Sequence, residues 1–277
     1  MSDHRRAFYK PEAIVKDVQE KIEKARQAGE AIDYLAFVPD GEPTLDSNLE
    51  REIELLKPLD IKIAVISNAS LIWNTDVRAA LMKADWVSLG TDAVREDIWR
   101  KIDRPHRSLP FAAILDGMLE FAKTYQGELV TETMLVKDIN DSDGHITEVA
   151  DFLAQVKPAK AYISIPTRPP AEKWVQPPGE ETINRAYQIL NRRIEGVEYL
   201  IGYEGNTFAF TGNVEEDLLD MTSVHPMREE AVKNFLARAK ADWVIIDKLI
   251  QQGKLIELGY EGKQFYMRKL QRQQVAG

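Results

Sequence analysis

The sequence predicts an α/β fold built on a parallel sheet, followed by a smaller C-terminal domain. Up to about residue 196, short and almost continuously apolar segments alternate with amphipathic segments of helical period. Strands of that composition are typical of a sheet whose two faces are both covered by helices, either open or curled into a barrel. After Gly196 the alternation stops, and the remaining residues predict helices and a hairpin.

The elements follow in a regular order. A helix is expected over residues 11–28, where Pro11 suits the first turn and apolar residues recur at three- and four-residue spacing. Residues 32–38 predict an apolar strand that ends at a turn-forming segment beginning with Pro39. The same alternation then predicts helices over residues 49–56, 76–82, 109–125, 146–156 and 180–194, and strands over residues 61–66, 86–89, 129–136 and 161–165. Residues 197–203 and 205–210 indicate a strand pair or an extended connection.

Residues 212–277 predict a winged-helix-like domain, which leaves residues 1–211 to the first domain. Helices are expected over residues 227–239 and 242–251, and the glycine-bounded segments 254–258 and 264–268 predict a hairpin. A helix that reads DNA is basic, but the second of these helices carries Asp242 and Asp247 against only Lys248. DNA binding is therefore not expected, and weak RNA contact by the basic hairpin and tail is a minor alternative.

The composition excludes several classes of protein. The 277 residues carry 36 basic and 45 acidic side chains, a net charge of −9 that gives no basic surface for wrapping nucleic acid. No apolar run approaches the roughly 18 residues of a membrane span, and no signal-peptide core follows the first residues, so we expect a cytoplasmic protein. The chain has no cysteine. Disulfides, thiolate zinc sites and an iron–sulfur cluster held by its own thiolates are thereby excluded.

Polar residues follow each of the five predicted strands. Ligands of parallel α/β sheets bind beyond the carboxyl ends of the strands, so these five loops could face one cleft. Glu42 could accept a hydrogen bond from a ligand ammonium group, and Arg168 could hold a carboxylate through two hydrogen bonds. The alternative is that such residues only form turns and helix caps. The candidate binding residues are Asp40, Gly41, Glu42, Pro43, Ser67, Asn68, Asp92 and Arg168.

Other kinds of site are not supported. The segment that starts at Asp138 resembles a calcium loop but has Asp143 and Val149 where such a loop needs glycine and glutamate. The four histidines are too scattered to suggest a zinc site. Neither a Walker A sequence nor G-x-G-x-x-G occurs. The sequence therefore predicts no metal site built from its own residues and no nucleoside triphosphate site.

Six blocks carry a resemblance in a fixed order. They are residues 5–9 (RRAFY), 37–45 (FVPDGEPTL), 66–71 (ISNASL), 102–106 (IDRPH), 134–141 (MLVKDIND) and 166–172 (PTRPPAE). Together they resemble the radical S-adenosylmethionine (SAM) iron–sulfur oxidoreductases related to the tRNA wybutosine-synthesis enzymes. The resemblance implies a partial (β/α)6 TIM-like barrel and SAM as the small-molecule cofactor. It also implies that Gly41-Glu42-Pro43 binds the methionyl amine and that Ser67-Asn68 lies beside the same cofactor.

The chain departs from this family in one respect. The family holds a [4Fe–4S] cluster with a C-x3-C-x2-C loop, whereas this sequence contains no cysteine, so it can neither hold the cluster nor form a 5′-deoxyadenosyl radical. We expect a truncated oxidoreductase of unknown substrate, because the loops keep cofactor-binding residue types. The alternative is a cluster-free binding or scaffold protein. A barrel without its first strand would expose an edge that favours self-association or pairing with a partner.

Overall fold

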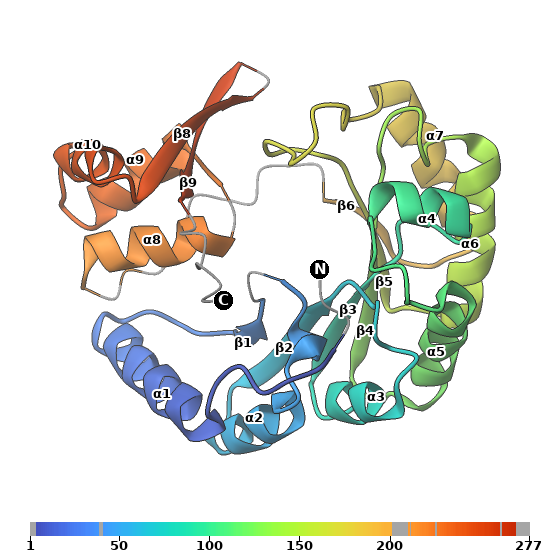
Figure 1. Cartoon of the computed structure of the whole chain (residues 1–277), viewed down its shortest axis with the longest axis horizontal. Coiled ribbons are helices and arrows are strands. Elements are labelled where there is room, and N and C mark those ends of the chain that lie inside the picture. Colours follow the sequence, from blue (N-terminus) through green and yellow to red (C-terminus); the bar gives the residue numbers. More distant parts are fainter. Residues whose placement is uncertain are drawn as a thin grey trace, which may run out of the picture. The chain divides into compact units, whose positions relative to one another are not determined.

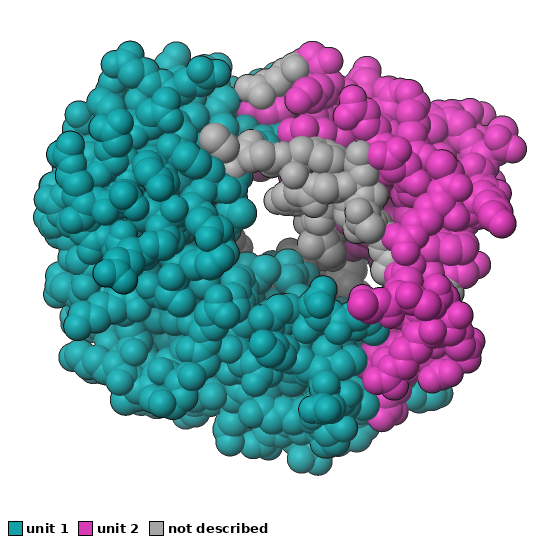
Figure 2. Space-filling view, turned by 180° about the vertical axis from the view of Figure 1, so that it is seen from behind, with its two compact units in different colours: residues 1–18, 32–167, 172–202 teal, residues 19–31, 168–171, 203–277 magenta. Residues whose placement is uncertain are grey.

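The structure is a computed structural model that describes residues 4–38, 41–200, 210, 212–224, 226–260 and 262–269. The chain forms two compact units (Figure 2). The first unit comprises residues 1–18, 32–167 and 172–202, and the second comprises residues 19–31, 168–171 and 203–277. The helix α1 (Pro11–Gln27) contributes to both units. The expected domain boundary at residues 211–212 stays a prediction.

The first unit is built on a six-stranded parallel sheet in the order β1-β2-β3-β4-β5-β6 (Figure 1). The strands are β1 (Tyr34–Phe37), β2 (Lys62–Ser67), β3 (Trp86–Gly90), β4 (Glu128–Met134), β5 (Lys160–Ser164) and β6 (Val197–Leu200). Each strand pairs in parallel with the next one along the chain, as in the register of Leu35 opposite Ile63. The predicted α/β class with a parallel, TIM-like sheet is therefore confirmed.

The last strand differs from the prediction. Residues 197–200 pair in parallel with β5, with Val197 opposite Ala161, and so complete the sheet as its sixth strand. Four residues after a glycine, of which only Val197 is buried, do not distinguish this pairing from a hairpin. The second half of the expected strand pair, residues 205–210, lies outside the described residues except for Phe210.

Helices connect the strands of the first unit. They are α2 (Leu49–Leu56), α3 (Thr75–Leu81), α4 (Glu96–Ile102), α5 (Phe111–Thr124), α6 (Asp143–Val156) and α7 (Glu180–Asn191), with the short 3-10 helices η1 (Pro43–Leu45) and η2 (Lys57–Leu59). The sequence predicts all of these helices except α4, η1 and η2. Over the described residues, no helix has both the length and the apolar character needed to cross a bilayer.

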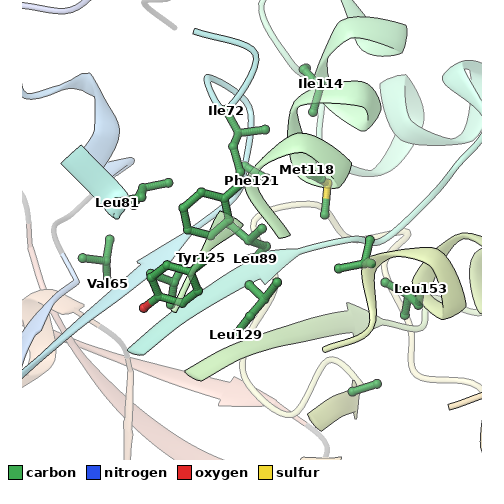
Figure 3. Close-up of a cluster of buried hydrophobic side chains, with 14 of the residues drawn as sticks. Val65, Ile72, Leu81, Leu89, Ile114, Met118, Phe121, Tyr125, Leu129 and Leu153 are labelled. Carbon is green, nitrogen blue, oxygen red and sulfur yellow. The ribbon is translucent and has the colours of Figure 1, made fainter. Parts of the chain in front are cut away.

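The core of this unit lies between one face of the sheet and the helices. Val65 and Leu89 of neighbouring strands are fully buried, as is Phe121 of α5 (Figure 3). The ring of Tyr125 stacks on Phe121 at 4.7 Å between ring centroids, and its hydroxyl donates to the Ala84 carbonyl at 2.9 Å. Successive side chains of a strand point to opposite faces of the sheet, so every second residue of β2 and β3 faces this core.

A glycine sets the distance between α5 and the loop that follows β2. A Cβ atom placed on Gly117 would lie 2.7 Å from the carbonyl oxygen of Ile72 and 2.9 Å from the Cα of Trp73. Both are backbone atoms, so they cannot move aside as a flexible side chain would. Gly117 therefore allows the helix to pack directly on the chain that continues from Ser67-Asn68.

The helix α2 buries an acidic side chain. Glu52 is 2% exposed, and its Oε1 atom has no hydrogen-bond partner among the described residues. Burial, assisted by the nearby charge of Asp46, raises the pKa of Glu52 to about 7. The ionised form is therefore the unfavourable one in the folded chain.

Glu52→Gln should stabilise the protein at high pH. The folded pKa lies above the unfolded one, so the stability contributed by protonated Glu52 is complete below about pH 4.5 and is lost as the pH rises through about 7. Glutamine cannot ionise, and we expect it to raise the free energy of unfolding by about 2–3 kcal/mol at pH 8 and by under about 1 kcal/mol at pH 5. Urea unfolding at both pH values measures this difference.

The matched control for that variant is Glu54→Gln on the same helix. Glu54 is exposed and pairs with Lys83 at 3.0 Å. An exposed pair of this kind contributes about 0–1 kcal/mol, so the control should change little at either pH. Equal stability changes of Glu52→Gln at pH 5 and pH 8 would show that its charge is not the cause.

The second unit contains a small antiparallel sheet and its own core. Its elements are α8 (Val214–Val224), β7 (Met227–Arg228), α9 (Glu229–Arg238), α10 (Val244–Gln251), β8 (Leu255–Tyr260) and β9 (Lys263–Arg268), with the strand order β7-β9-β8. Phe235, Ile246 and Leu249 are buried at its centre. The two expected helices and the hairpin are present, and α8 and β7 are additional. The winged-helix assignment stays a prediction.

Candidate functional site

The carboxylate of Glu42 joins two strand-end loops of the first unit. Its Oε1 atom accepts hydrogen bonds from the Thr44 amide at 3.1 Å, the Thr44 hydroxyl at 2.6 Å and the Ser67 hydroxyl at 2.8 Å. Its Oε2 atom accepts from the Asn68 amide at 2.8 Å. Glu42 is 9% exposed. Four donors thus form hydrogen bonds with one buried carboxylate, and they fix the loop after β1 against the loop after β2.

The loop after β2 is held in an uncommon backbone conformation. The Ser67 hydroxyl also accepts from the Ala69 amide at 3.0 Å, and the Asn68 Oδ1 atom accepts from the Ser70 amide at 2.9 Å. Ala69 has φ of 61°, the left-handed region that non-glycine residues rarely adopt. Such strain is typical of loops whose geometry serves a site.

The N-terminal segment fixes the other side of the loop after β1. The Arg5 guanidinium donates to the carbonyl oxygens of Thr44 and Asp46, each at 3.0 Å. Arg6 forms a parallel bridge with Asp46. The block RRAFY, which the sequence could not connect to a role, therefore positions the chain that follows Glu42.

A cavity of about 380 Å³ lies beside this network. It is lined by Gly41, Glu42, Leu45, Asn68, Ser70, Leu71, Trp99, Asp103, Pro105, His106 and Leu109. One wall is apolar, and the Trp99 ring in it packs against Phe111 at 4.9 Å between centroids. Two carboxylates, and no lysine or arginine, are among the described residues that line it.

The second carboxylate of the cavity, Asp103, is hydrogen-bonded to Asp92. Asp92 Oδ1 accepts from the Met134 amide at 2.7 Å, and the Asp92 backbone carbonyl accepts from Asn140 at 2.8 Å. Burial raises the pKa of Asp103 to about 6. Burial, with the added charge of Asp103, raises the pKa of Asp92 well above its usual value. Burial thus favours the protonated form of both carboxyls, and more strongly that of Asp92.

The structure brings most of the predicted site residues together. Gly41, Glu42 and Asn68 line the cavity, and Ser67 holds Glu42. Pro43 is buried at the start of η1, and Asp92 reaches the cavity through Asp103. Asp40 lies outside the described residues. Arg168 belongs to the second unit.

Trp99, Asp103 and His106 are among the cavity residues that the sequence analysis did not name as candidates. Trp99 lies on α4, a seven-residue helix whose mixed composition gives no clear period. Asp103 and His106 fall in the block IDRPH, which was noted for its resemblance without a role. The block itself was thus the signal that could have located them. Thr44 lies in the block FVPDGEPTL, which likewise could have located it, and both its amide and its hydroxyl donate hydrogen bonds to Glu42.

The residues present fit SAM but not the [4Fe–4S] cluster that the resemblance also implies. A [4Fe–4S] cluster requires three thiolates, and the sequence has none. Over the described residues there is also no group of three or more side chains that could hold a metal ion. SAM, an organic cation with an ammonium and a sulfonium group, fits a cavity of about 380 Å³ with two carboxylates and an apolar wall.

Comparison with known proteins identifies the family. The model of the radical SAM superfamily matches residues 2–153. UPF0026 protein MJ1312 of Methanocaldococcus jannaschii is 48% identical over 268 residues, which cover 96% of this chain and 83% of that relative. The chain therefore belongs to the radical SAM superfamily, in which it groups with the UPF0026 proteins.

Solved structures share the fold at low sequence identity. TYW1 with a lysine-pyruvate adduct bound gives a TM-score of 0.52 at 17% identity, covering 68% of this chain and 64% of that one. Streptococcus suis SuiB bound to S-adenosylmethionine gives a TM-score of 0.52 at 14% identity, covering 68% of this chain and 43% of that one. The chain thus spans less than two thirds of either protein. The predicted membership in the radical SAM superfamily is confirmed, and the solved structures confirm the fold.

Proposed function

We propose that this chain binds SAM in the cavity beside Glu42 and Asn68, and that it is the cysteine-free part of a radical SAM oxidoreductase. The observation that carries the proposal is the convergence of two loops. Gly41 and Glu42 follow β1, Asn68 follows β2, and all three line one cavity of about 380 Å³. Their types are those that the family uses for the methionyl end of the cofactor, and membership in that family supports the transfer.

The residues of the chain bind and orient this cofactor in a defined way. The Glu42 carboxylate is already fixed by four donors, so it meets a ligand ammonium group without reorganisation. Asn68 offers a side-chain amide to the same cavity, and Leu71 and Trp99 add apolar surface that excludes water. SAM supplies the reactive sulfonium centre in this family. Its reductive cleavage needs three thiolates that this sequence does not contain.

Calorimetric titration with SAM tests the proposal. Without a cluster to chelate the methionine end, we expect weak binding with a Kd of ~0.1–1 mM, a free energy of about −4 to −5.5 kcal/mol. Ser70→Trp places a large ring in the cavity and should abolish binding. Ser47→Trp is the matched control, since Ser47 is exposed and does not line the cavity. Absence of a saturable heat with the parent protein, or equal binding by Ser70→Trp, would refute the assignment.

The chain by itself should carry no iron. After anaerobic reconstitution with iron and sulfide, we expect a colourless protein, because no thiolate is available to hold a cluster. Iron and sulfide analysis after desalting measures this, with a heat-unfolded sample as the control for adventitious metal. Stoichiometric iron and sulfide with the charge-transfer absorption of a four-iron cluster would contradict the expectation.

The alternative is a protein that binds the cofactor without the radical chemistry. It shares the cavity with the first proposal and differs in having no cluster-binding thiolates at all. An in-frame C-x3-C-x2-C sequence in the genomic DNA upstream of Met1 would favour a longer oxidoreductase. A stop codon close upstream would favour the cluster-free protein.

The edge of the sheet gives a place for a missing strand or a partner. In the described part of the chain, β1 pairs with β2 alone. Its other edge therefore presents backbone N–H and C=O groups that another strand can pair with. We infer that the first strand of the complete barrel, or a second chain, would bind there. RNA contact by the second unit remains the minor alternative.

A further inference from the structure

The parallel sheet of the first unit has a second face, opposite the one that packs against the helices. Ile163 of β5 belongs to the helical core and lies opposite Thr133 of β4 in the register. Successive side chains of a strand point to opposite faces, so the preceding pair, Tyr162 and Glu132, lies on the second face. Met134, two residues after Glu132, lies there as well. All three of these side chains are partly exposed, so a ligand can reach them.

The Glu132 carboxylate is partly buried and has no compensating group. Among the described residues it has no hydrogen-bond donor and no ion-pair partner. Lys160, two residues before Tyr162 on the neighbouring strand, pairs with Glu198 at 2.8 Å. A carboxylate that has lost part of its hydration without gaining a donor is stabilised by a cation that binds beside it. This part of the sheet therefore favours a positively charged ligand.

The backbone around Glu132 is held in place by hydrogen bonds. The Thr91 amide donates to the Glu132 carbonyl at 2.8 Å, and the Thr133 hydroxyl donates to the Thr91 carbonyl at 2.9 Å. The Met134 amide donates to the Asp92 Oδ1 atom at 2.7 Å. These bonds join the end of β4 to the loop after β3. The Glu132 side chain thus projects from a fixed position, which lowers the cost of ordering it around a ligand.

The neighbours of Glu132 on the second face leave room for a ligand with an apolar body. Its register partner on β3 is Gly90, which has no side chain. Its register partner on β5 is Tyr162, whose ring offers an aromatic surface. Two residues further along β5, the Ser164 Oγ atom is buried and has no hydrogen-bond partner among the described residues. A buried hydroxyl of this kind is a group that a ligand can satisfy.

Gly90 also brings Glu132 close to the cavity described above. A Cβ atom on Gly90 would lie 3.4 Å from the Cα of Asn68, and Asn68 lines that cavity. The strand that is the direct neighbour of Glu132 therefore ends against a wall of the cavity.

We propose that Glu132 binds the ammonium group of a second ligand, an organic cation with an apolar body, on the second face of the sheet. Tyr162 and Met134 contact the apolar body, and Ser164 hydrogen-bonds a polar group of the same ligand. The assignment of this ligand as the substrate that reacts beside SAM rests on the proposed function. Glu42 and Glu132 then bind different molecules, the cofactor and a cationic substrate.

Solution NMR with benzylammonium tests this assignment, with benzyl alcohol as the neutral ligand of similar shape. The methyl resonance of Met134, assigned with Met134→Leu, should shift saturably with benzylammonium. Glu132→Gln should weaken this binding by about tenfold, whereas the binding of benzyl alcohol should change less than about twofold. Glu132→Asp keeps the charge and should retain part of the affinity. Glu128→Gln is the matched control, because Glu128 is an exposed carboxylate on the same strand and the same face.

Three results would overturn the assignment: no saturable Met134 shift in the parent, equal weakening of both ligands by Glu132→Gln, or unchanged benzylammonium binding by that variant. Calorimetry with SAM separates this assignment from the proposed function, because Glu132→Gln should bind SAM as the parent does. Benzylammonium binding without any SAM binding would support the Glu132 site and refute the proposed function. SAM binding without a benzylammonium shift would do the reverse. Thermal unfolding of each variant confirms that it is folded.

Discussion

Gly117→Ala is expected to lower the free energy of unfolding by about 2–3 kcal/mol, as overpacking of a tight contact does. The new methyl group would lie 2.7 Å from the Ile72 carbonyl oxygen, so α5 or the loop after β2 must move. For a chain of this size the midpoint of thermal unfolding should fall by roughly 5–10 °C. Since that loop begins at Ser67-Asn68, SAM affinity should fall as well.

Gly144→Ala is the matched control, because it also lies in a helix but meets nothing within 4 Å. Alanine is the better helix former by about 0.5–1 kcal/mol, so the control should stabilise the protein slightly. The two glycine variants should therefore change stability in opposite directions. A Gly117→Ala protein as stable as Gly144→Ala would contradict the close packing of α5 on Ile72.

Glu42→Ala should have an effect on stability and binding together. Removal of the carboxylate leaves the amides of Thr44 and Asn68 and the hydroxyls of Thr44 and Ser67 without their acceptor. Buried donors without a partner cost about 1–3 kcal/mol each, and because these losses overlap we expect about 3–4 kcal/mol in total. Both SAM and S-adenosylhomocysteine should lose affinity, because the loop that carries Asn68 is released. Urea unfolding and calorimetry measure the two effects.

The control for this variant is Glu120→Ala. Glu120 is 59% exposed and pairs with Arg78 at 2.8 Å, so its loss should cost under about 1 kcal/mol. Glu42→Gln keeps the side-chain length but places an NH2 group among donors, and it should fall between the parent and the alanine variant. If Glu42→Ala unfolds like Glu120→Ala, the carboxylate does not hold the two loops.

Most of the sheet could be predicted because its strands are short apolar runs between turn residues. The expected strand at residues 61–66 differs from β2 (Lys62–Ser67) by one residue at each end. The parallel pairing of residues 197–200 could not be predicted from the sequence, because strand direction depends on contacts between residues distant in sequence. The sequence did not predict helix α4, because seven residues with four charged side chains show little periodicity.

The candidate site was predictable in its residue types and not in its contacts. Turn chemistry and the resemblance singled out Gly41, Glu42 and Asn68, and the structure places them at one cavity. The hydrogen bond from Ser67 to Glu42 spans 25 residues and depends on the register of neighbouring strands. The pairing of Asp92 with Asp103 depends in the same way on where α4 ends, which the sequence did not show.

The most direct test of the central claim is a crystal structure of the chain soaked with millimolar SAM. The account predicts that the methionyl end lies in the cavity with its ammonium group within hydrogen-bond distance of Glu42. A cofactor bound elsewhere on the chain, or a cavity that stays empty while calorimetry shows binding, would contradict the claim that these loops are the SAM site.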